Sequence, residues 1–199
     1  MSPARHLSVL LAVLLLSACI APNVAPPRRL LLAYEGAPPV EMETAAARPR
    51  LVVRAVTVPD YLDHRSLVYR AETVELRQHP QAEWAERPAK SITRWLTQAL
   101  AAQRPDYAVL AYTTPDGRAP DASLTLSLDA FETGADGLLR LRGNWAFAEH
   151  AEAAALSGRF DADARPSAPT PEATVAAMQQ ALQLATARLV ERLPKVAAP

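Results

Sequence analysis

The residue whose chemistry is most clearly specified by its neighbours is Cys19, the single cysteine of the 199-residue chain. It ends the run Leu16-Ser17-Ala18-Cys19, which follows a short basic start and an apolar stretch from Leu7 to Leu16. A basic start, an apolar stretch and small residues before the cleavage point are typical of an export signal. The stretch is also too short for a membrane-spanning helix, which needs about 20 residues. We therefore predict a lipobox, with cleavage before Cys19 and attachment of a diacylglycerol to its thiol.

An ordinary buried cysteine is the alternative interpretation of Cys19, because cysteine often serves as a small hydrophobic residue. Lipidation instead predicts membrane association through an N-terminal lipid anchor. One acyl chain gives only marginal binding, whereas several chains, such as diacylglycerol with palmitate, anchor a protein stably. Residues 1–18 would then be the signal peptide. The proline-rich residues 19–29 would be a tether that spans about 30 Å when extended.

Residue types that support catalysis or metal binding are present, but their spacing suits neither function. No pair of histidines has the spacing of zinc ligands; the four are His6, His64, His79 and His150. No nucleophile elbow, phosphate-binding loop or dinucleotide fingerprint occurs. Two carboxylate pairs are typical of solvated surface charges rather than of a general acid and base: Asp60 with Asp63, and Glu83 with Glu86. We expect no catalytic residue, no metal site, no cofactor and no enzymatic activity.

The composition is that of one globular domain plus a tether. Half of the residues are hydrophobic, which is enough for a core, and the chain after residue 18 has the size of one ordinary domain. Basic and acidic residues number 21 each, and Arg5 is the only charged residue before Cys19. The mature chain is therefore close to neutral, which argues against a nucleic-acid partner. With Cys19 acylated, no thiol remains for a disulfide bond, so packing alone must stabilise the fold.

Hydrophobic patterning predicts a sheet and two helices. Alternation is strongest in residues 123–131, 138–149 and 156–160, and it is typical of antiparallel strands with one solvated face. Shorter strands are predicted at 30–34, 51–58, 66–70, 73–77 and 107–112. One helix should begin at Pro88 and end at Arg104-Pro105. A second should begin at Thr170-Pro171, with an apolar stripe from Val175 to Leu193. The predicted fold class is α+β: a single domain, residues 30–196, with a mostly antiparallel sheet and two main helices packed on one face.

Two segments place large apolar side chains where a turn would normally be polar. They are residues 58–65, which contain Tyr61 and Leu62, and residues 83–88, which contain Trp84. One interpretation is that these side chains fold back and close the ends of the sheet. The other is that they form a protein-binding rim, because aromatic anchors carry much of the energy of interfaces.

These segments resemble the family of ABC-type transport auxiliary lipoproteins. The resemblance rests on Val56-Thr57-Val58-Pro59-Asp60-Tyr61-Leu62-Asp63, then Val68-Tyr69-Arg70, then Trp84-Ala85-Glu86 with Ile92 and Leu100 on the following helix. It extends from about Leu30 to the last helix. The chain departs from the family pattern at His64-Arg65, where an arginine would follow Asp63 directly. It departs again at Arg87-Pro88, where Pro-Leu would follow Glu86.

The resemblance implies a non-catalytic adaptor. Such a protein would be lipid-anchored in the outer membrane of a Gram-negative bacterium and face the periplasm. It would dock onto an MCE-domain protein of an intermembrane lipid transport system and support envelope integrity. Ile20 rather than aspartate follows Cys19, so the usual cue for retention at the inner membrane is missing. If the rim interpretation holds, we expect Pro59, Tyr61, Leu62 and Trp84 to contact the partner.

Other functions stay open at this point. One is an outer-membrane lipoprotein that binds a lipid or peptide in an apolar cavity between sheet and helices. Another is an assembly lipoprotein for an outer-membrane β-barrel. Formation of a homo-oligomer is compatible with each of these roles.

Overall fold

The computed structural model describes residues 26–36, 48–112, 119–149 and 156–196. Cys19, the predicted signal peptide and most of the predicted tether lie outside the described residues, as do His6 and His150. The described residues cover most of the predicted domain, residues 30–196, apart from the gaps between these ranges.

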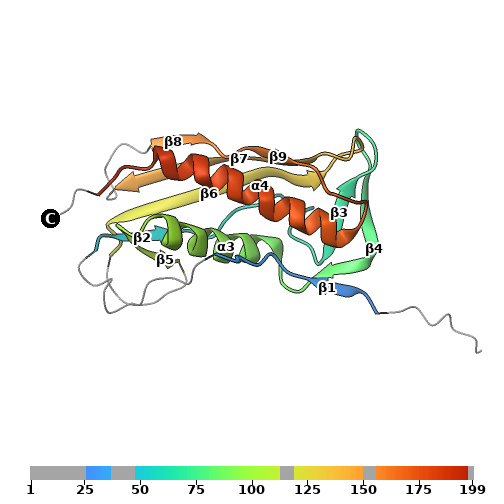
Figure 1. Cartoon of the computed structure of the whole chain (residues 1–199), viewed down its shortest axis with the longest axis horizontal. Helices are drawn as coiled ribbons and strands as arrows, with labels where there is room; N and C mark the ends of the chain where they lie inside the picture. The colour runs from blue at the N-terminus through green and yellow to red at the C-terminus, as the bar shows by residue number, and fades with distance from the viewer. Residues whose placement is uncertain (1–25, 37–47, 113–118, 150–155, 197–199) are drawn as a thin grey trace, which may run out of the picture.

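A long antiparallel pair of strands, β6 (Ala122–Thr133) and β7 (Leu139–Glu149), forms the centre of the sheet (Figure 1). Their pairing runs from Ala122 opposite Glu149 to Thr133 opposite Leu139. The turn between them includes Gly137, which has a φ of 72°. Glycine adopts this left-handed conformation at little energetic cost. The alternating leucines predicted both strands and this turn, and the structure confirms them.

Strands from the first half of the chain share the other edge of β6. β2 (Arg50–Val53) pairs in parallel with the start of β6, and β3 (Ser66–Arg70) pairs in parallel with its end. β5 (Ala108–Ala111) extends the sheet beyond β2. Beyond β3 lie β4 (Leu76–Trp84) and then β1 (Arg28–Leu30).

The second half of the chain completes the sheet on the far side of β7. There β7 pairs antiparallel with β8 (Leu156–Arg159) and with the short β9 (Ala162–Ala164). The α+β fold class is confirmed, and the longest pairing is antiparallel as expected. Four strand pairs of the described part are nevertheless parallel, which leucine alternation along one strand cannot reveal.

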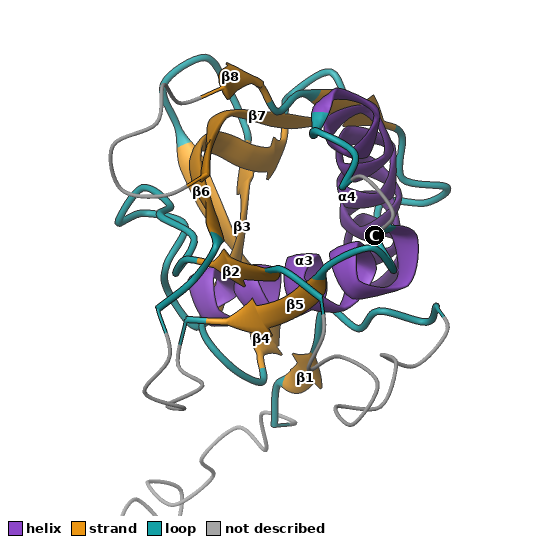
Figure 2. Ribbon diagram, turned by 90° about the vertical axis from the view of Figure 1, so that its left-hand side faces the viewer, coloured by secondary structure: helices purple, strands orange, loops and turns teal. Residues whose placement is uncertain are grey.

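Two helices cover one face of this curved sheet (Figure 2). They are α3 (Pro88–Gln103) and α4 (Pro171–Arg192). Each begins at the proline where the sequence predicted the start of the helix. The Thr170 hydroxyl accepts a hydrogen bond from the backbone N–H of Ala173 (3.3 Å), so the predicted N-cap of α4 is confirmed.

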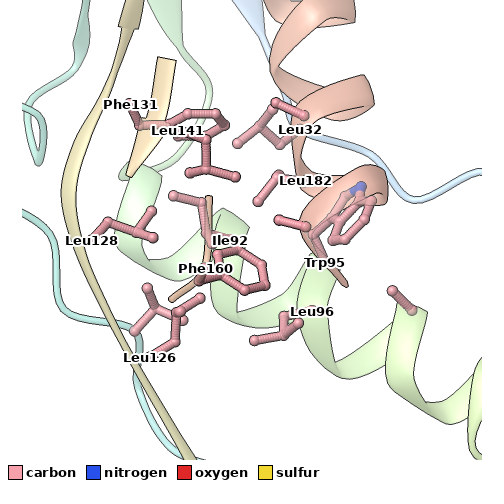
Figure 3. Packing of buried hydrophobic residues seen from close by; sticks show 14 of the residues in the cluster. Leu32, Ile92, Trp95, Leu96, Leu126, Leu128, Phe131, Leu141, Phe160 and Leu182 are labelled. Atoms are coloured by element: carbon pink, nitrogen blue, oxygen red, sulfur yellow. The ribbon is translucent and has the colours of Figure 1, made fainter. Parts of the chain in front are cut away.

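The core lies between the helices and the sheet (Figure 3). β6 contributes Leu126, Leu128 and Phe131, which face Ile92 and Trp95 of α3 and Leu182 of α4, and all of these are at most 2% exposed. The predicted apolar stripe of α4 is buried as well, from Val175 to Leu193. Burial of each large apolar side chain contributes about 1.5–3 kcal/mol, so a core of this size can stabilise the domain without a disulfide bond.

The predicted bounds of three strands were wrong: β1 is Arg28–Leu30 instead of 30–34, β2 is Arg50–Val53 instead of 51–58, and β4 is Leu76–Trp84 instead of 73–77. Residues 71–75 form the turn of the β3–β4 hairpin, where the Ala71 N–H donates to the Glu75 carbonyl (2.9 Å), and β4 begins only at Leu76. β4 then runs through Pro80, at the point where the pairing with β3 shifts register between Ser66 and Val68. Such an irregularity tolerates a residue that cannot donate a hydrogen bond to the ladder.

Candidate functional site

The start of the described chain lies close to the first turn of α4. Arg28 of β1 forms an ion pair with Glu172 of α4 (2.7 Å). Lipidation of Cys19 stays a prediction, since that residue is outside the described part. No helix among the described residues is long and apolar enough to span a bilayer. Within the same residues, no cluster of histidine, cysteine, aspartate and glutamate side chains could hold a metal ion.

The segment 58–65 forms a tight surface loop. The Pro59 carbonyl accepts hydrogen bonds from the backbone N–H groups of Leu62 (2.9 Å) and Asp63 (3.2 Å). Leu62 is 5% exposed and lies in the core, whereas Pro59 and Tyr61 are half-buried and Asp60 is exposed. Leu62 therefore holds the loop to the core, while Pro59, Asp60 and Tyr61 remain accessible at the surface.

A buried carboxylate fixes Tyr61 against the sheet. Glu132 of β6 is 5% exposed. It accepts hydrogen bonds from the Tyr61 hydroxyl (3.2 Å), from Arg70 Nη2 (2.8 Å) and from the backbone N–H of Phe131 (2.9 Å). A buried carboxylate is costly unless it is paired and hydrogen-bonded, and these three donors meet that requirement. The loop, β3 and β6 are thereby joined by one polar cluster.

The electrostatics of this cluster keep Tyr61 a hydrogen-bond donor. Burial, followed by the negative charge of Glu132, raises the pKa of Tyr61 to about 12. The phenol is therefore protonated at every physiological pH. This stable donation suits a positioning contact between the loop and the sheet rather than proton transfer.

Trp84 is the last residue of β4, not part of a polar turn, and it is 3% exposed. Its side chain and that of Leu62 line an interior pocket with a volume of about 10 Å³, roughly the space that one water molecule needs. The structure thus supports the first interpretation for Leu62 and Trp84, because both close the core. A partner cannot reach either side chain without opening the core, so the accessible rim is reduced to Pro59 and Tyr61.

The acidic residues beside the loop hold the N-terminus of α3. Asp63 accepts hydrogen bonds from the backbone N–H of Ala89 (3.2 Å) and from Arg87 Nη1 (3.0 Å). Glu86 accepts from the Ser91 hydroxyl (2.9 Å) and forms an ion pair with Arg94. Carboxylates at a helix N-terminus are stabilised by the helix dipole. Asp63 and Glu86 therefore have structural tasks, in addition to being solvated charges.

A surface groove of about 200 Å³ runs between the loop and the β3–β4 hairpin. Tyr61 and His64 line it from the loop, and Val68, Leu76, Arg77 and Gln78 line it from the hairpin. Sequence reasoning identified Tyr61 but missed Leu76, which is 37% exposed, and the Arg70–Glu132 pair beneath. The one available signal was Glu132 itself, a charged residue directly after the apolar Phe131.

These features describe a small α+β domain with an accessible loop beside a surface groove. Residues 31–190 match the family described as the ABC-type transport auxiliary lipoprotein component. Because the match spans most of the chain, the protein belongs to this family. It is therefore a lipoprotein component auxiliary to transport, and the resemblance seen in the sequence is confirmed.

Two solved structures share the fold. A crystal structure of an uncharacterized protein is 18% identical with a TM-score of 0.69, and covers 84% of this chain and 98% of its own. Protein XCC0632 from Xanthomonas campestris is 19% identical with a TM-score of 0.61, and covers 84% of this chain and 92% of its own. A search among curated proteins found no match to the sequence.

Proposed function

We propose that this protein is a non-catalytic adaptor of an MCE-type intermembrane lipid transport system, anchored in the outer membrane through Cys19. The observation that carries the proposal is the family match over residues 31–190, since it names a lipoprotein auxiliary to transport. The lipobox before Cys19 supports the anchor, and Ile20 in place of aspartate supports the outer membrane. The adaptor acts by position: it holds one end of a protein conduit at the membrane.

The accessible part of the 58–65 loop is the proposed contact with the MCE-domain protein. Pro59 and Tyr61 supply rigid apolar surface, and Tyr61 is held in place by its bond to the buried Glu132. A side chain that is already ordered loses less entropy when it is bound. Leu62 and Trp84 support the surface from the core rather than touch the partner.

The state of the acidic side chains favours a binding role over catalysis. Asp63, Glu86 and Glu132 are each engaged by an arginine in the structure. A general acid or base must instead be free to reach a substrate proton. These ion pairs give the three acidic residues a structural role.

Lipid storage between sheet and helices is less well supported. The interior pocket beside Trp84 and Leu62 has a volume of about 10 Å³, whereas ligand pockets usually have about 300–1,000 Å³. An acyl chain does not fit there without repacking of the core.

Affinity purification tests the proposal. The full-length chain, expressed with a C-terminal tag in its own host and extracted in mild detergent, should retain an MCE-domain protein identified by mass spectrometry. The isolated outer-membrane fraction should contain the complex. Enrichment of a β-barrel protein without any MCE-domain protein would instead support the assembly-lipoprotein alternative.

A further inference from the structure

A second, larger pocket lies at the end of the molecule where α4 begins. Its volume is about 540 Å³, within the range of small-molecule sites. It lies between the β3–β4 hairpin and the loop that precedes α4. The residues that matter for its chemistry are Tyr69 and His79 of the hairpin, Thr133 of β6, Arg165 and Ser167 of the loop, and Thr174 of α4.

The lining combines one cation with several hydroxyl groups and contains no carboxylate among the described residues. Arg165 is exposed, and its Nη1 donates a hydrogen bond to the Asp136 carbonyl (3.3 Å). The other N–H groups of its planar guanidinium can still donate to a ligand. Two carboxylates at this end form ion pairs with other arginines: Asp136 with Arg140 (2.5 Å) and Glu172 with Arg28 (2.7 Å). The charge of Glu172 still acts on His79, so Arg165 is the cation that must attract an anion to this pocket. A guanidinium among hydroxyl groups suits a phosphate, which accepts several charge-assisted hydrogen bonds.

Two further groups of the lining lack a strong partner of their own. The Thr133 hydroxyl is buried and finds no hydrogen-bond partner among the described residues, and an unpaired buried hydroxyl is costly. His79 packs against the Tyr69 ring with centroids 4.8 Å apart. Burial lowers the pKa of His79, so at neutral pH its ring is uncharged and combines an apolar face with an N–H donor.

The pocket lies at the end of the domain where the described chain begins. Figure 1 shows β1, the β3–β4 hairpin and the start of α4 together, opposite the C-terminus. The Arg28–Glu172 ion pair joins β1 to α4 two residues before Thr174 of the pocket. Seven residues lead from Cys19 to Pro26, and even a fully extended chain of that length spans at most about 25 Å. A lipid anchor on Cys19 would therefore keep this end near the bilayer.

We propose that this pocket binds the phosphate-bearing headgroup of a phospholipid from the membrane that holds the anchor. The recognised chemistry is a phosphate diester, held by Arg165 and by the hydroxyl groups of Thr133 and Ser167. Pro166, Ala168 and Pro169 give the pocket an apolar wall for the glycerol backbone. The inference rests on the proposed lipidation of Cys19 for the choice of a membrane source. It concerns a site distinct from both the interior pocket and the loop that we assign to the partner.

Titration of the unacylated mature chain tests this proposal. The chain begins at residue 19 and carries Cys19→Ser, so that no anchor contributes. Dihexanoyl phosphatidylglycerol is added below its critical micelle concentration, and amide shifts are followed by NMR. We expect saturable shifts at Thr133, Ser167 and Thr174. In Arg165→Gln the affinity should fall by about tenfold or more, as expected for loss of a charged hydrogen bond.

Control variants distinguish binding in the pocket from nonspecific electrostatic attraction and from effects on folding. Arg159→Gln removes the same charge from β8, where Arg159 is exposed and paired with Asp161, and should leave the affinity unchanged. Thr133→Val should weaken binding while the melting temperature stays equal or rises, because its hydroxyl has no partner to lose. Absence of saturable shifts, or equal affinity in Arg165→Gln, overturns the proposal.

Soluble probes separate the two sources of phosphate. Glycerophosphoglycerol and inorganic phosphate should bind more weakly than the phospholipid. If either binds equally well, the pocket is a site for a soluble anion and the membrane source is overturned. Because the titrated chain has neither anchor nor partner, its outcome is independent of MCE capture. Loss of capture with intact lipid binding would reject the proposed function alone.

Discussion

At the scale of single residues, the hydrogen bonds of Glu132 explain why Tyr61 has a fixed position. The carboxylate is buried, and its oxygens are shared by the Tyr61 hydroxyl, Arg70 and a backbone N–H. Removal of one donor leaves the charge partly satisfied by the other two. The cost of such a change should therefore be that of one hydrogen bond rather than that of an unpaired buried charge.

Tyr61→Phe tests the bond between the loop and Glu132. We expect the free energy of unfolding to fall by about 0.5–1.5 kcal/mol, measured by urea denaturation. Tyr112→Phe is the matched control, because Tyr112 is 60% exposed, and its effect should stay within about 0.5 kcal/mol. Equal effects of the two substitutions would show that the Tyr61 bond contributes nothing to stability.

Cys19→Ala tests the anchor. Wild-type protein should incorporate radiolabelled palmitate in cells, and the variant should not, because the thiol is the proposed site of acylation. The folded domain should be unaffected, since Cys19 precedes the first described residue, Pro26. Labelling of the variant would contradict lipidation at this residue.

His79 predicts a pH dependence of stability. Burial lowers its pKa below the ordinary value of 6.5, with a smaller opposing effect from Glu172. Between the folded and unfolded pKa values the unfolded chain binds more protons, so stability rises with pH in that window. The melting temperature should therefore fall as the pH drops below about 6.5. His79→Gln should reduce the difference in melting temperature between pH 7.5 and pH 5.5. An unchanged difference would contradict the role of His79.

At the scale of elements, local patterns predicted the helices and the two long strands. Their burial alternates with the period of the element itself, so each one can be recognised without knowledge of its neighbours. β4 could not be recognised in this way. Its sequence is polar and contains Pro80, and it forms a strand because β3 and β1 pair with it on either side. Pairing with neighbouring strands leaves no periodic signal in the sequence of β4 itself.

Thr170→Ala tests the cap of α4. The hydroxyl accepts a bond from the Ala173 N–H, and the loss of such a cap typically costs about 1 kcal/mol. Thermal or urea unfolding should show this loss. The exposed Thr73 in the β3–β4 turn provides the control, and Thr73→Ala should have little effect. If the two variants are equally stable, the cap does not stabilise the domain.

At the scale of the whole molecule, the site could be predicted only in part. The sequence identified the segment around Tyr61, but it left open whether Leu62 and Trp84 face solvent or the core. For Trp84 that choice depends on β4 continuing as far as this residue, which is a tertiary feature. Tyr61, Arg70 and Glu132 also meet from three distant parts of the chain. No local pattern could have brought them together.

The β3–β4 hairpin links the two surfaces that we assign. On β3, Val68 lines the groove beside Tyr61, while the next residue, Tyr69, lines the larger pocket at the α4 end. Successive residues of a strand point to opposite faces, so one hairpin can serve both. The molecule can thus present one surface to a protein partner and another to the membrane.

Site-specific photocrosslinking in living cells tests the adaptor role most directly. The photoreactive amino acid p-benzoyl-phenylalanine replaces Asp60, which is exposed between Pro59 and Tyr61, or Leu184 of α4, which is 41% exposed. The adaptor role predicts an adduct with an MCE-domain protein from position 60 and none from position 184. An adduct from position 60 with only a β-barrel protein, or no adduct at all, would contradict it.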